Sequence, residues 1–317
     1  MPPLYTRSLL LAVAPLPLMA QQATPATTTT PVKIGGFIQA RLAYQEAVGL
    51  TATLNRARLQ ATGTIAPAFS YRLQAEFRTG NVGTGKASVS LADAYIRWSR
   101  RALGIQVGQM KTPFTREYVT SIADIETLDR STVVDSLAPK RDIGLTMDYQ
   151  AGKRVFVVAG VFNGEGQNVT ANRDSTVLGV ARATVQPIPQ VTFGANIARY
   201  FGDSTRYGAD VSVEHRALVL RGELVAQARD SAGGTVDRGW FVLAGYKVTP
   251  AVQLVGKYER FDREAISPQQ ANRAASGGVN WYVVPATVRL SAFYVSRKVG
   301  NPGIRTGTLQ TQLQVRF

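Results

Sequence analysis

The chain has no cysteine and a single histidine, His215, among its 317 residues. Without cysteine it cannot form a disulfide framework, ligate an iron–sulfur cluster or use a catalytic thiol. One histidine leaves almost no material for a histidine-based metal site or for a serine–histidine catalytic pair. We therefore expect a protein that works without a metal, a cofactor or covalent catalysis.

Long hydrophobic runs are also missing. The apolar stretch "SLLLAVAPLPLMA", residues 8–20, is too short and too rich in proline for a membrane-spanning helix, and no later stretch approaches the required length. With Arg7 before it and the small Ala20 at its end, this stretch has the form of a secretory signal peptide. We predict a signal peptide over 1–20, a linker over 21–32 and a folded part over 33–317. An exported chain of this kind is periplasmic, secreted or an outer-membrane barrel.

Alternation of polar and apolar residues is present almost everywhere after Lys33, and helical periodicity is nearly absent. In "YRLQAEFR", residues 71–78, every second side chain is apolar and the others are charged or amide side chains. Sixteen such segments begin near residues 33, 54, 69, 88, 103, 141, 154, 176, 191, 206, 218, 239, 252, 273, 286 and 308. Most run for about 8 to 12 residues, the length that a tilted strand needs to cross a bilayer.

The connections between these segments alternate strictly between short and long. The short ones cover 66–68, 99–102, 150–153, 187–190, 216–217, 249–251 and 283–286. The longer, polar ones lie near 47–53, 79–87, 111–140, 163–175, 201–205, 229–238, 261–272 and 296–307. Short turns at one rim and long loops at the other are typical of outer-membrane barrels. We predict an all-β fold, a transmembrane antiparallel β-barrel of about 16 strands, in the outer membrane of a Gram-negative-type bacterium.

A sheet in lipid must close on itself, and sixteen strands enclose a lumen too wide to fill with wall side chains. We therefore expect the polar face to line a water-filled lumen and the apolar face to meet lipid. The inward basic residues are then Arg41, Arg56, Arg58, Arg72, Arg78, Arg97, Arg182, Arg221, Lys247, Lys257, Arg289 and Arg316. The inward acidic residues are Glu76, Asp93, Asp142, Asp148, Asp210, Glu214, Glu223 and Glu259, so bases outnumber acids by four.

Six of the inward arginines fall in the first four predicted strands, at positions 41, 56, 58, 72, 78 and 97. Basic residues in a pore favour anions, and the planar guanidinium group suits phosphate. Two alternatives stay open: the excess bases pair with acids on neighbouring strands, or they contact acidic lipopolysaccharide at the outer rim. Nucleic acid is not an expected partner, because the charge follows the strands and forms no separate patch or reading motif.

The longest connection, 111–140, is long enough to fold into the lumen and narrow it. Its basic residues are Lys111, Arg116, Arg130 and Lys140. Its acidic residues are Glu117, Asp124, Glu126, Asp129 and Asp135, so its net charge is −1. A constriction of mixed charge is predicted, and a transverse field of acids facing bases is as compatible with it as anion capture.

Several motifs resemble the phosphate-selective porin O and P family: "NRARLQATGTIAPAFSYRLQAEF", "DAYIRW", "GQMKTPFTREY", "LDRSTVVDSLAPKRDIGL", "VFNGEG" and the closing aromatic strand. The pair "GQMKTPF" and "LAPKRDIG", which brackets the long loop, is the most specific part. The resemblance implies a sixteen-stranded, trimeric outer-membrane channel whose third loop folds inward. By match to these motifs it also implies that Asp93, Lys111, Arg130 and Arg141 lie at the constriction.

We predict an outer-membrane porin, a passive diffusion channel that prefers anions, with phosphate or polyphosphate as candidate solutes. The alternative is a general, weakly selective porin for small hydrophilic solutes. The expected partners are such anions, outer-membrane lipid and lipopolysaccharide, and further copies in a homotrimer. The candidate pore-lining or anion-binding residues are Arg41, Arg56, Arg58, Arg72, Arg78, Asp93, Arg97, Lys111, Arg116, Arg130, Lys140 and Arg141.

Two further classes of function fit the sequence less well. An outer-membrane enzyme would have to rely on His215, which falls on the outward parity beside a short turn, or on Asp210 and Glu214 as paired carboxylates. An adhesive or structural barrel would need large outer loops, and apart from 111–140 the loops are modest in length.

Overall fold

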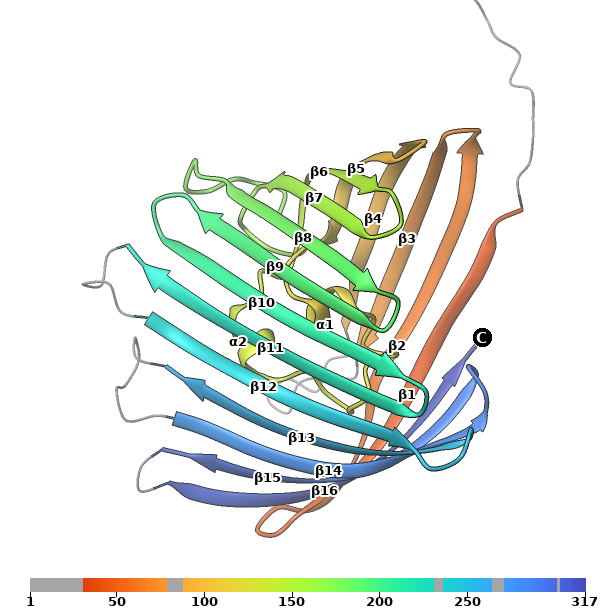
Figure 1. The fold of residues 1–317 in the computed structure, drawn as a ribbon, viewed down its shortest axis with the longest axis vertical. Coiled ribbons are helices and arrows are strands. Elements are labelled where there is room, and N and C mark those ends of the chain that lie inside the picture. The colour runs from red at the N-terminus through yellow and green to blue at the C-terminus, as the bar shows by residue number, and fades with distance from the viewer. Residues whose placement is uncertain (1–30, 79–87, 231–235, 264–270, 301–302) are drawn as a thin grey trace, which may run out of the picture. The chain divides into compact units, whose positions relative to one another are not determined.

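The computed structural model describes residues 31–78, 88–230, 236–263, 271–300 and 303–317. Residues Pro31–Phe317 form one compact unit. Within the described residues, sixteen strands pair antiparallel with their neighbours in sequence, and β1 pairs with β16 to close a barrel (Figure 1). The predicted fold class is thus confirmed. The predicted signal peptide and nearly all of the linker lie outside the described residues and stay predictions.

The strands are β1 (Lys33–Gln45), β2 (Gly49–Ala66), β3 (Phe69–Arg78), β4 (Ser88–Arg100), β5 (Leu103–Lys111), β6 (Arg141–Ala151), β7 (Val155–Phe162), β8 (Leu178–Ile188), β9 (Val191–Tyr200), β10 (Ser204–His215), β11 (Leu218–Arg229), β12 (Val236–Lys247), β13 (Val252–Asp262), β14 (Ala271–Val284), β15 (Val288–Val299) and β16 (Ile304–Arg316). Two short helices, α1 (Arg116–Val119) and α2 (Thr132–Leu137), lie between β5 and β6. No helix of the described residues is long and apolar enough to cross a membrane.

Strand β2 begins at Gly49, five residues before the position that alternation predicts. Its pairing with β1 shifts register between Gln39 and Ala40, so that Asn55 is an extra residue on β2. A bulge of this kind interrupts strict alternation and lets two successive residues serve one face. The side chains of Asn55 and Arg56 accordingly both reach inward, where Asn55 donates to Gln39 and Gln312 and Arg56 pairs with Glu76.

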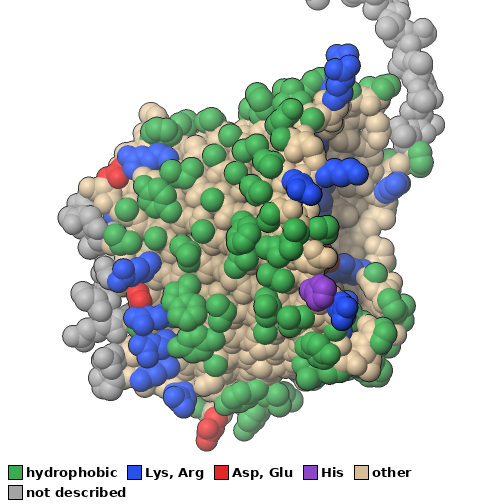
Figure 2. Space-filling view, viewed as in Figure 1, with side chains coloured by type: hydrophobic (Ala, Val, Ile, Leu, Met, Phe, Trp, Pro, Cys, Tyr) green, Lys and Arg blue, Asp and Glu red, His purple; other side chains and the backbone are tan. Residues whose placement is uncertain are grey.

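The two faces of the wall differ as the alternation predicts. On β16, Leu309 and Leu313 are exposed on the outside, whereas Gln312 and Gln314 are buried on the inside. Figure 2 shows hydrophobic side chains spread over the outer surface of the barrel. Exposed aromatic side chains are spread over the outer face, several of them near strand ends, as expected for interface girdles; among them are Tyr44, Tyr149, Tyr207, Trp240, Tyr246, Tyr258, Trp281 and Tyr294.

The third loop, which joins β5 to β6, carries α1 and α2 into the interior of the barrel (Figure 1). Each helix begins at a hydroxyl residue, Thr115 or Ser131, whose side chain accepts a hydrogen bond from a backbone N–H of the first turn. The inward course of this loop agrees with the prediction from its length and its bracketing motifs.

The expectation of a polar inner face is wrong for much of β7–β15. There the inner face carries buried apolar residues, namely Phe162, Leu178, Val180, Val225, Phe241, Leu243, Val255, Phe261 and Phe293. They pack with Phe114, Leu128, Val133, Val134 and Leu137 of the loop. Full burial of one such large side chain stabilises by roughly 1.5–3 kcal/mol. This part of the wall is apolar because the loop, and not water, covers it.

Candidate pore constriction

The tip of the third loop is tied to β1 and β16 by charged contacts. The Arg41 guanidinium donates to both carboxylate oxygens of Asp129, at 2.7 and 3.0 Å. Arg316 pairs with Asp124 at 2.5 Å and also donates to the backbone carbonyl of Ala123. These contacts hold the tip of the loop against one side of the wall.

Backbone carbonyls of the loop also receive hydrogen bonds from the wall. Asn280 of β14 donates to the Glu126 carbonyl at 2.7 Å, and Arg289 of β15 donates to the Ile125 carbonyl at 3.0 Å. Carbonyl groups in a buried loop must find donors, and here the neighbouring strands supply them.

A buried anchor lies around the start of α2. The Glu117 carboxylate accepts hydrogen bonds from the backbone N–H and the hydroxyl of Ser131, both at 2.8 Å. Glu259 of β13 accepts from the Thr132 hydroxyl at 2.6 Å, and Lys257 lies between the two carboxylates, 3.9 Å from Glu117 and 3.5 Å from Glu259. Burial raises the pKa of Glu117, although Lys257 and the hydrogen bonds from Ser131 oppose the shift.

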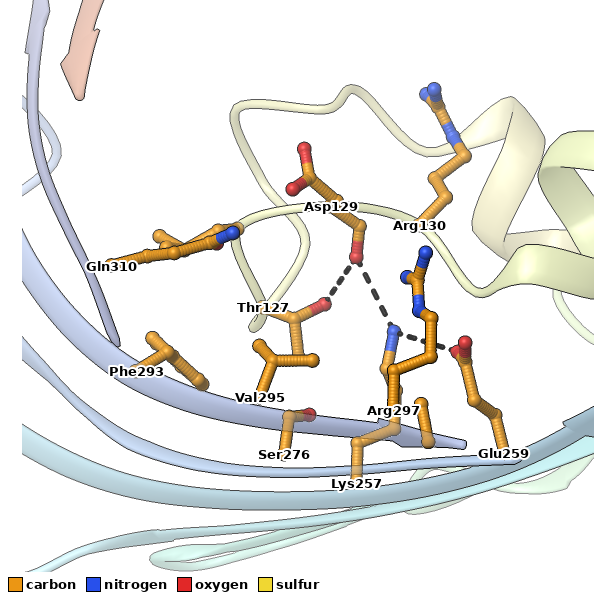
Figure 3. A pocket seen from close by; sticks show the side chains of 12 residues that line it. Thr127, Asp129, Arg130, Lys257, Glu259, Ser276, Phe293, Val295, Arg297 and Gln310 are labelled. Atoms are coloured by element: carbon orange, nitrogen blue, oxygen red, sulfur yellow. Dashed lines mark hydrogen bonds and ion pairs between the residues drawn. The ribbon is translucent and has the colours of Figure 1, made fainter. Parts of the chain in front are cut away.

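Figure 3 shows a small cavity of about 70 Å³ beside this anchor, between the loop and the strands β13–β16. The Lys257 ammonium group donates to the Asp129 carbonyl at 3.3 Å across it. Arg130 points away from this wall (Figure 3). The anchors of the loop therefore lie on the β13–β16 side, and the Arg130 side chain extends toward the opposite side.

On that other side, two carboxylates are shared by four arginines of the barrel wall. Glu76 of β3 pairs with Arg56, at 3.2 Å, and with Arg58, both from β2. Asp93 of β4 pairs with Arg141 of β6 at 2.7 Å and with Arg72 of β3 at 3.3 Å. One carboxylate neutralises only one guanidinium group. Each carboxylate with its two arginines therefore retains a net charge of +1.

Lys111 ends β5 where that strand turns into the loop. Three residues earlier, Gly108 has φ +128°, and a Cβ there would lie 2.2 Å from the Ala94 carbonyl oxygen of β4. Only glycine permits this approach. The Lys111 ammonium group donates to three consecutive carbonyls at the end of α1, those of Tyr118, Val119 and Thr120, at 2.9–3.1 Å.

Arg130 is held by the same turn. It donates to the Glu117 carbonyl at 3.1 Å and to the Thr120 carbonyl at 3.2 Å, and its guanidinium group lies 5.3 Å from the centre of the Tyr118 ring. The Lys111 nitrogen lies 5.6 Å from the centre of the same ring, so both side chains contact its π face. Burial raises the pKa of Tyr118 to about 12, so the phenol stays neutral and offers no compensating charge.

These side chains form what we call the constriction cluster: Arg56, Arg58, Arg72, Glu76, Asp93, Lys111, Arg130 and Arg141. Its parts are close enough that Arg141, Arg130, Asp93 and Arg58 all act electrostatically on Tyr118. Five guanidinium groups share two carboxylates, which leaves three of their positive charges without a carboxylate partner among the described residues. The structure thus brings the four residues implied by the family motifs, at positions 93, 111, 130 and 141, into one cluster.

Other predicted site residues lie elsewhere. Arg41 ties down the loop, and Lys140 pairs with Asp135 at 3.4 Å, outside the cluster. The side chain of Arg78 is outside the described part of the chain. Arg97 donates to both oxygens of Asp148, at 2.6 and 2.8 Å.

A cavity of about 440 Å³ lies next to the cluster. Its lining includes Arg97, Arg116 and Arg182, together with Lys111 of the cluster. Arg182 pairs with Asp210 at 2.6 Å. Glu214 pairs with Arg221. Asp210 and Glu214, the two carboxylates considered for glycoside chemistry, therefore each form an ion pair with a different arginine.

Sequence reasoning missed Tyr118 and the role of Glu76. Tyr118 stands in "GQMKTPFTREY", yet nothing in its spacing distinguishes it from a core aromatic residue such as Phe114. Glu76 is assigned inward by parity, but alternation cannot reveal that it serves two arginines of β2. Among the described residues, no cluster of side chains has the composition of a metal site.

Comparison with solved structures finds outer-membrane channels. The anion-selective porin of Comamonas acidovorans has a TM-score of 0.68 at 12% identity, over 91% of this chain and 100% of that one. OmpT of Vibrio cholerae in its trimer form has a TM-score of 0.66 at 12% identity, over 91% and 99%. The channel DcaP of Acinetobacter baumannii has a TM-score of 0.65 at 14% identity, over 91% and 97%. At these identities the likeness concerns the fold.

No curated protein sequence matches the chain. The family model for phosphate-selective porin O and P matches residues 36–196, half of the chain, and this range contains most of β1, all of β2–β8, the third loop and the whole constriction cluster. The barrel, its inward loop and this match agree, and the chain belongs to the phosphate-selective porin O and P family of outer-membrane channels.

Proposed function

We propose that this porin is a passive channel that prefers anions and that the constriction cluster sets the preference. The observation that carries the proposal is the unequal pairing in the cluster, where two carboxylates serve four arginines and a fifth, Arg130, binds only carbonyls and an aromatic ring. A narrow passage with low-dielectric walls focuses the field of such charges. The family and the fold are those of channels rather than enzymes.

The cations are fixed before any ion arrives. Arg58 and Arg141 are buried and hydrogen-bonded to Glu76 and Asp93. Lys111 and Arg130 are held by the turn after α1. Because these groups need not reorganise, an entering anion meets a positive field at little entropic cost. The planar arginines suit phosphate as the solute within this proposal.

A general, weakly selective porin is the second candidate. Glu76 and Asp93 lie inside the cluster and reduce its field, and the loop brings further acids into the lumen, Asp129 among them. This alternative predicts a reversal potential close to zero in a salt gradient. We also propose a homotrimer, supported by the trimer form of the OmpT neighbour, and chemical cross-linking in detergent would test it.

The decisive experiment measures reversal potentials in planar bilayers under a KCl gradient. The double variant Arg72→Gln/Arg130→Gln removes two guanidinium charges of the cluster, and we expect the chloride-to-potassium permeability ratio to fall on the order of tenfold. The matched control, Lys153→Gln/Arg154→Gln, removes two exposed cations at a short turn and should keep the wild-type ratio.

Cation preference in the wild type would refute the anion channel. If the double variant keeps the wild-type permeability ratio, the constriction cluster does not set the selectivity. Titrating phosphate into chloride then tests the solute: block of the single-channel current at low phosphate supports a binding site, and absence of block leaves the general porin.

A further inference from the structure

A row of basic residues stands on the outer face of the barrel, where the long loops leave it. Arg260 of β13 is directly paired with Arg273 of β14, Arg273 with Lys298 of β15, and Lys298 with Arg305 of β16. The four side chains therefore form one line across four neighbouring strands, which we call the outer basic row. Figure 2 shows Lys and Arg side chains gathered at this rim, beside hydrophobic ones.

The row faces lipid and not the lumen. Two residues before Arg260 on the same face of β13 lies Tyr258, which is 40% exposed and contacts Trp240 of β12, with ring centres 5.6 Å apart. Tyr294, exposed, is four residues before Lys298 on β15. Aromatic residues of this kind mark the membrane interface, so the row lies at the level of the outer-leaflet headgroups.

Little on the protein balances this charge. Arg260 pairs with Asp262 at 2.9 Å. Arg273, Lys298 and Arg305 have no carboxylate within ion-pair distance in the described part of the chain. Like charges directly opposite each other on a sheet are destabilising. The repulsion within a row of them is stronger next to lipid, because the dielectric constant is lower there. Such a row is favourable when an anion from outside the chain lies against it.

An apolar hollow adjoins the row on the membrane side. It has a volume of about 630 Å³ and is lined on the outer face by Leu220, Val242 and Tyr258, with Ala244 and Gly256 among its other lining residues. Gly256 pairs with Gly277 of β14, and a Cβ at either position would meet open space. Tyr258 belongs to the hollow and lies two residues from Arg260.

We propose that the outer basic row binds the phosphate groups of an outer-leaflet glycolipid of the lipid A type, whose acyl chains lie in the apolar hollow. In such a lipid the phosphate groups lie at the headgroup level and the acyl chains lie deeper in the membrane. On the barrel, the outer basic row lies at the headgroup level and the apolar hollow lies deeper, so the two match. Each Lys or Arg near an anionic lipid surface strengthens binding about fivefold. This site is independent of anion selectivity, because its side chains point away from the pore.

The test uses the purified, folded barrel and three lipids: bis-phosphorylated lipid A, the same lipid without phosphates, and phosphatidylethanolamine. Binding is measured by native mass spectrometry in detergent, with folding checked by the heat-dependent shift on a denaturing gel. The variant Arg273→Gln/Lys298→Gln/Arg305→Gln should bind bis-phosphorylated lipid A on the order of 100-fold more weakly than wild type. Its binding of the other two lipids should not change.

The matched control is Arg100→Gln/Lys153→Gln/Arg154→Gln, which removes three exposed cations at the short-turn rim. It should bind like wild type. The single variant Lys298→Gln, with an expected loss of about fivefold, keeps the test valid if the triple variant fails to fold.

Equal binding of bis-phosphorylated lipid A by wild type and triple variant would overturn the proposal. So would equal losses for the lipid with and without phosphates, since the row would then act on something other than phosphate. Dissociation of an oligomer by the triple variant without loss of lipid would instead make this row a contact between copies. A reversal potential equal to wild type in the triple variant separates this outcome from any failure of the proposed selectivity.

Discussion

The two sides of the lumen use the same residue types for different purposes. On the β13–β16 and β1 side, Arg41, Arg289 and Arg316 are occupied with the loop, through Asp129, the Ile125 carbonyl and Asp124. On the β2–β6 side, arginines crowd around Glu76 and Asp93, which are too few to neutralise them. A count of inward arginines therefore does not measure the field in a pore. What matters is how many of them the protein itself has already paired.

The largest effect is expected from breaking the anchor that creates this asymmetry. Glu117→Ala leaves the Ser131 N–H and hydroxyl without their acceptor and leaves Lys257 without one of its carboxylates. Leaving a buried donor without its acceptor costs roughly 1–3 kcal/mol per donor. We expect a released loop, a clearly higher single-channel conductance and a lower melting temperature.

Two control variants accompany this test. Glu117→Gln keeps the shape and an oxygen acceptor for Ser131, so it should stay closer to wild type than Glu117→Ala. Asp135→Ala removes an exposed loop acid, 68% accessible, and should change neither quantity. Wild-type conductance in Glu117→Ala would show that the apolar contacts of the loop hold it without the anchor.

A smaller effect should follow when the basic side is made still less balanced. Asp93→Asn removes the carboxylate that Arg72 and Arg141 share, which raises the uncompensated charge of the cluster by one. We expect the chloride-to-potassium permeability ratio to rise severalfold, measured from reversal potentials. Asp135→Asn makes the same change of charge outside the cluster and should leave the ratio as it is. A fall in the ratio would show that Arg141 needs Asp93 to keep its position.

The fold was predictable because its signal is local. In a barrel each strand has one wet or covered face and one lipid face, so "TLQTQLQVRF" already shows which side of β16 is which. The same parity places Arg58 and Arg72 inside. Two features do not follow from alternation, because they depend on contacts between residues far apart in the sequence. They are the bulge at Asn55 and the apolar part of the inner wall, which includes Phe241 and Phe261 and packs against the third loop.

The candidate site was predictable only in its residues, not in its pairing. Asp93, Lys111, Arg130 and Arg141 come from motifs and meet in one cluster, but that Lys111 and Arg130 bind carbonyls instead of carboxylates depends on the turn after α1. Arg41 is inward by parity, as predicted, yet its role is set by Asp129, 88 residues away in the sequence. Partners at that distance leave no periodic signal.

The smallest expected effect concerns pH. Burial raises the pKa of Glu117 above its usual range, against the opposing influence of Lys257. A carboxyl group whose pKa rises on folding stabilises the fold at low pH, and that contribution is lost as the pH increases from the unfolded value, about 4.3, through the raised value. Relative to Glu117→Gln, the wild-type melting temperature should therefore decrease slightly over this window. The guanidinium groups of the constriction cluster stay charged throughout it. A wild-type melting temperature that increases instead would mean that Lys257 outweighs burial, and the anchor would then be a true ion pair like those on the basic side.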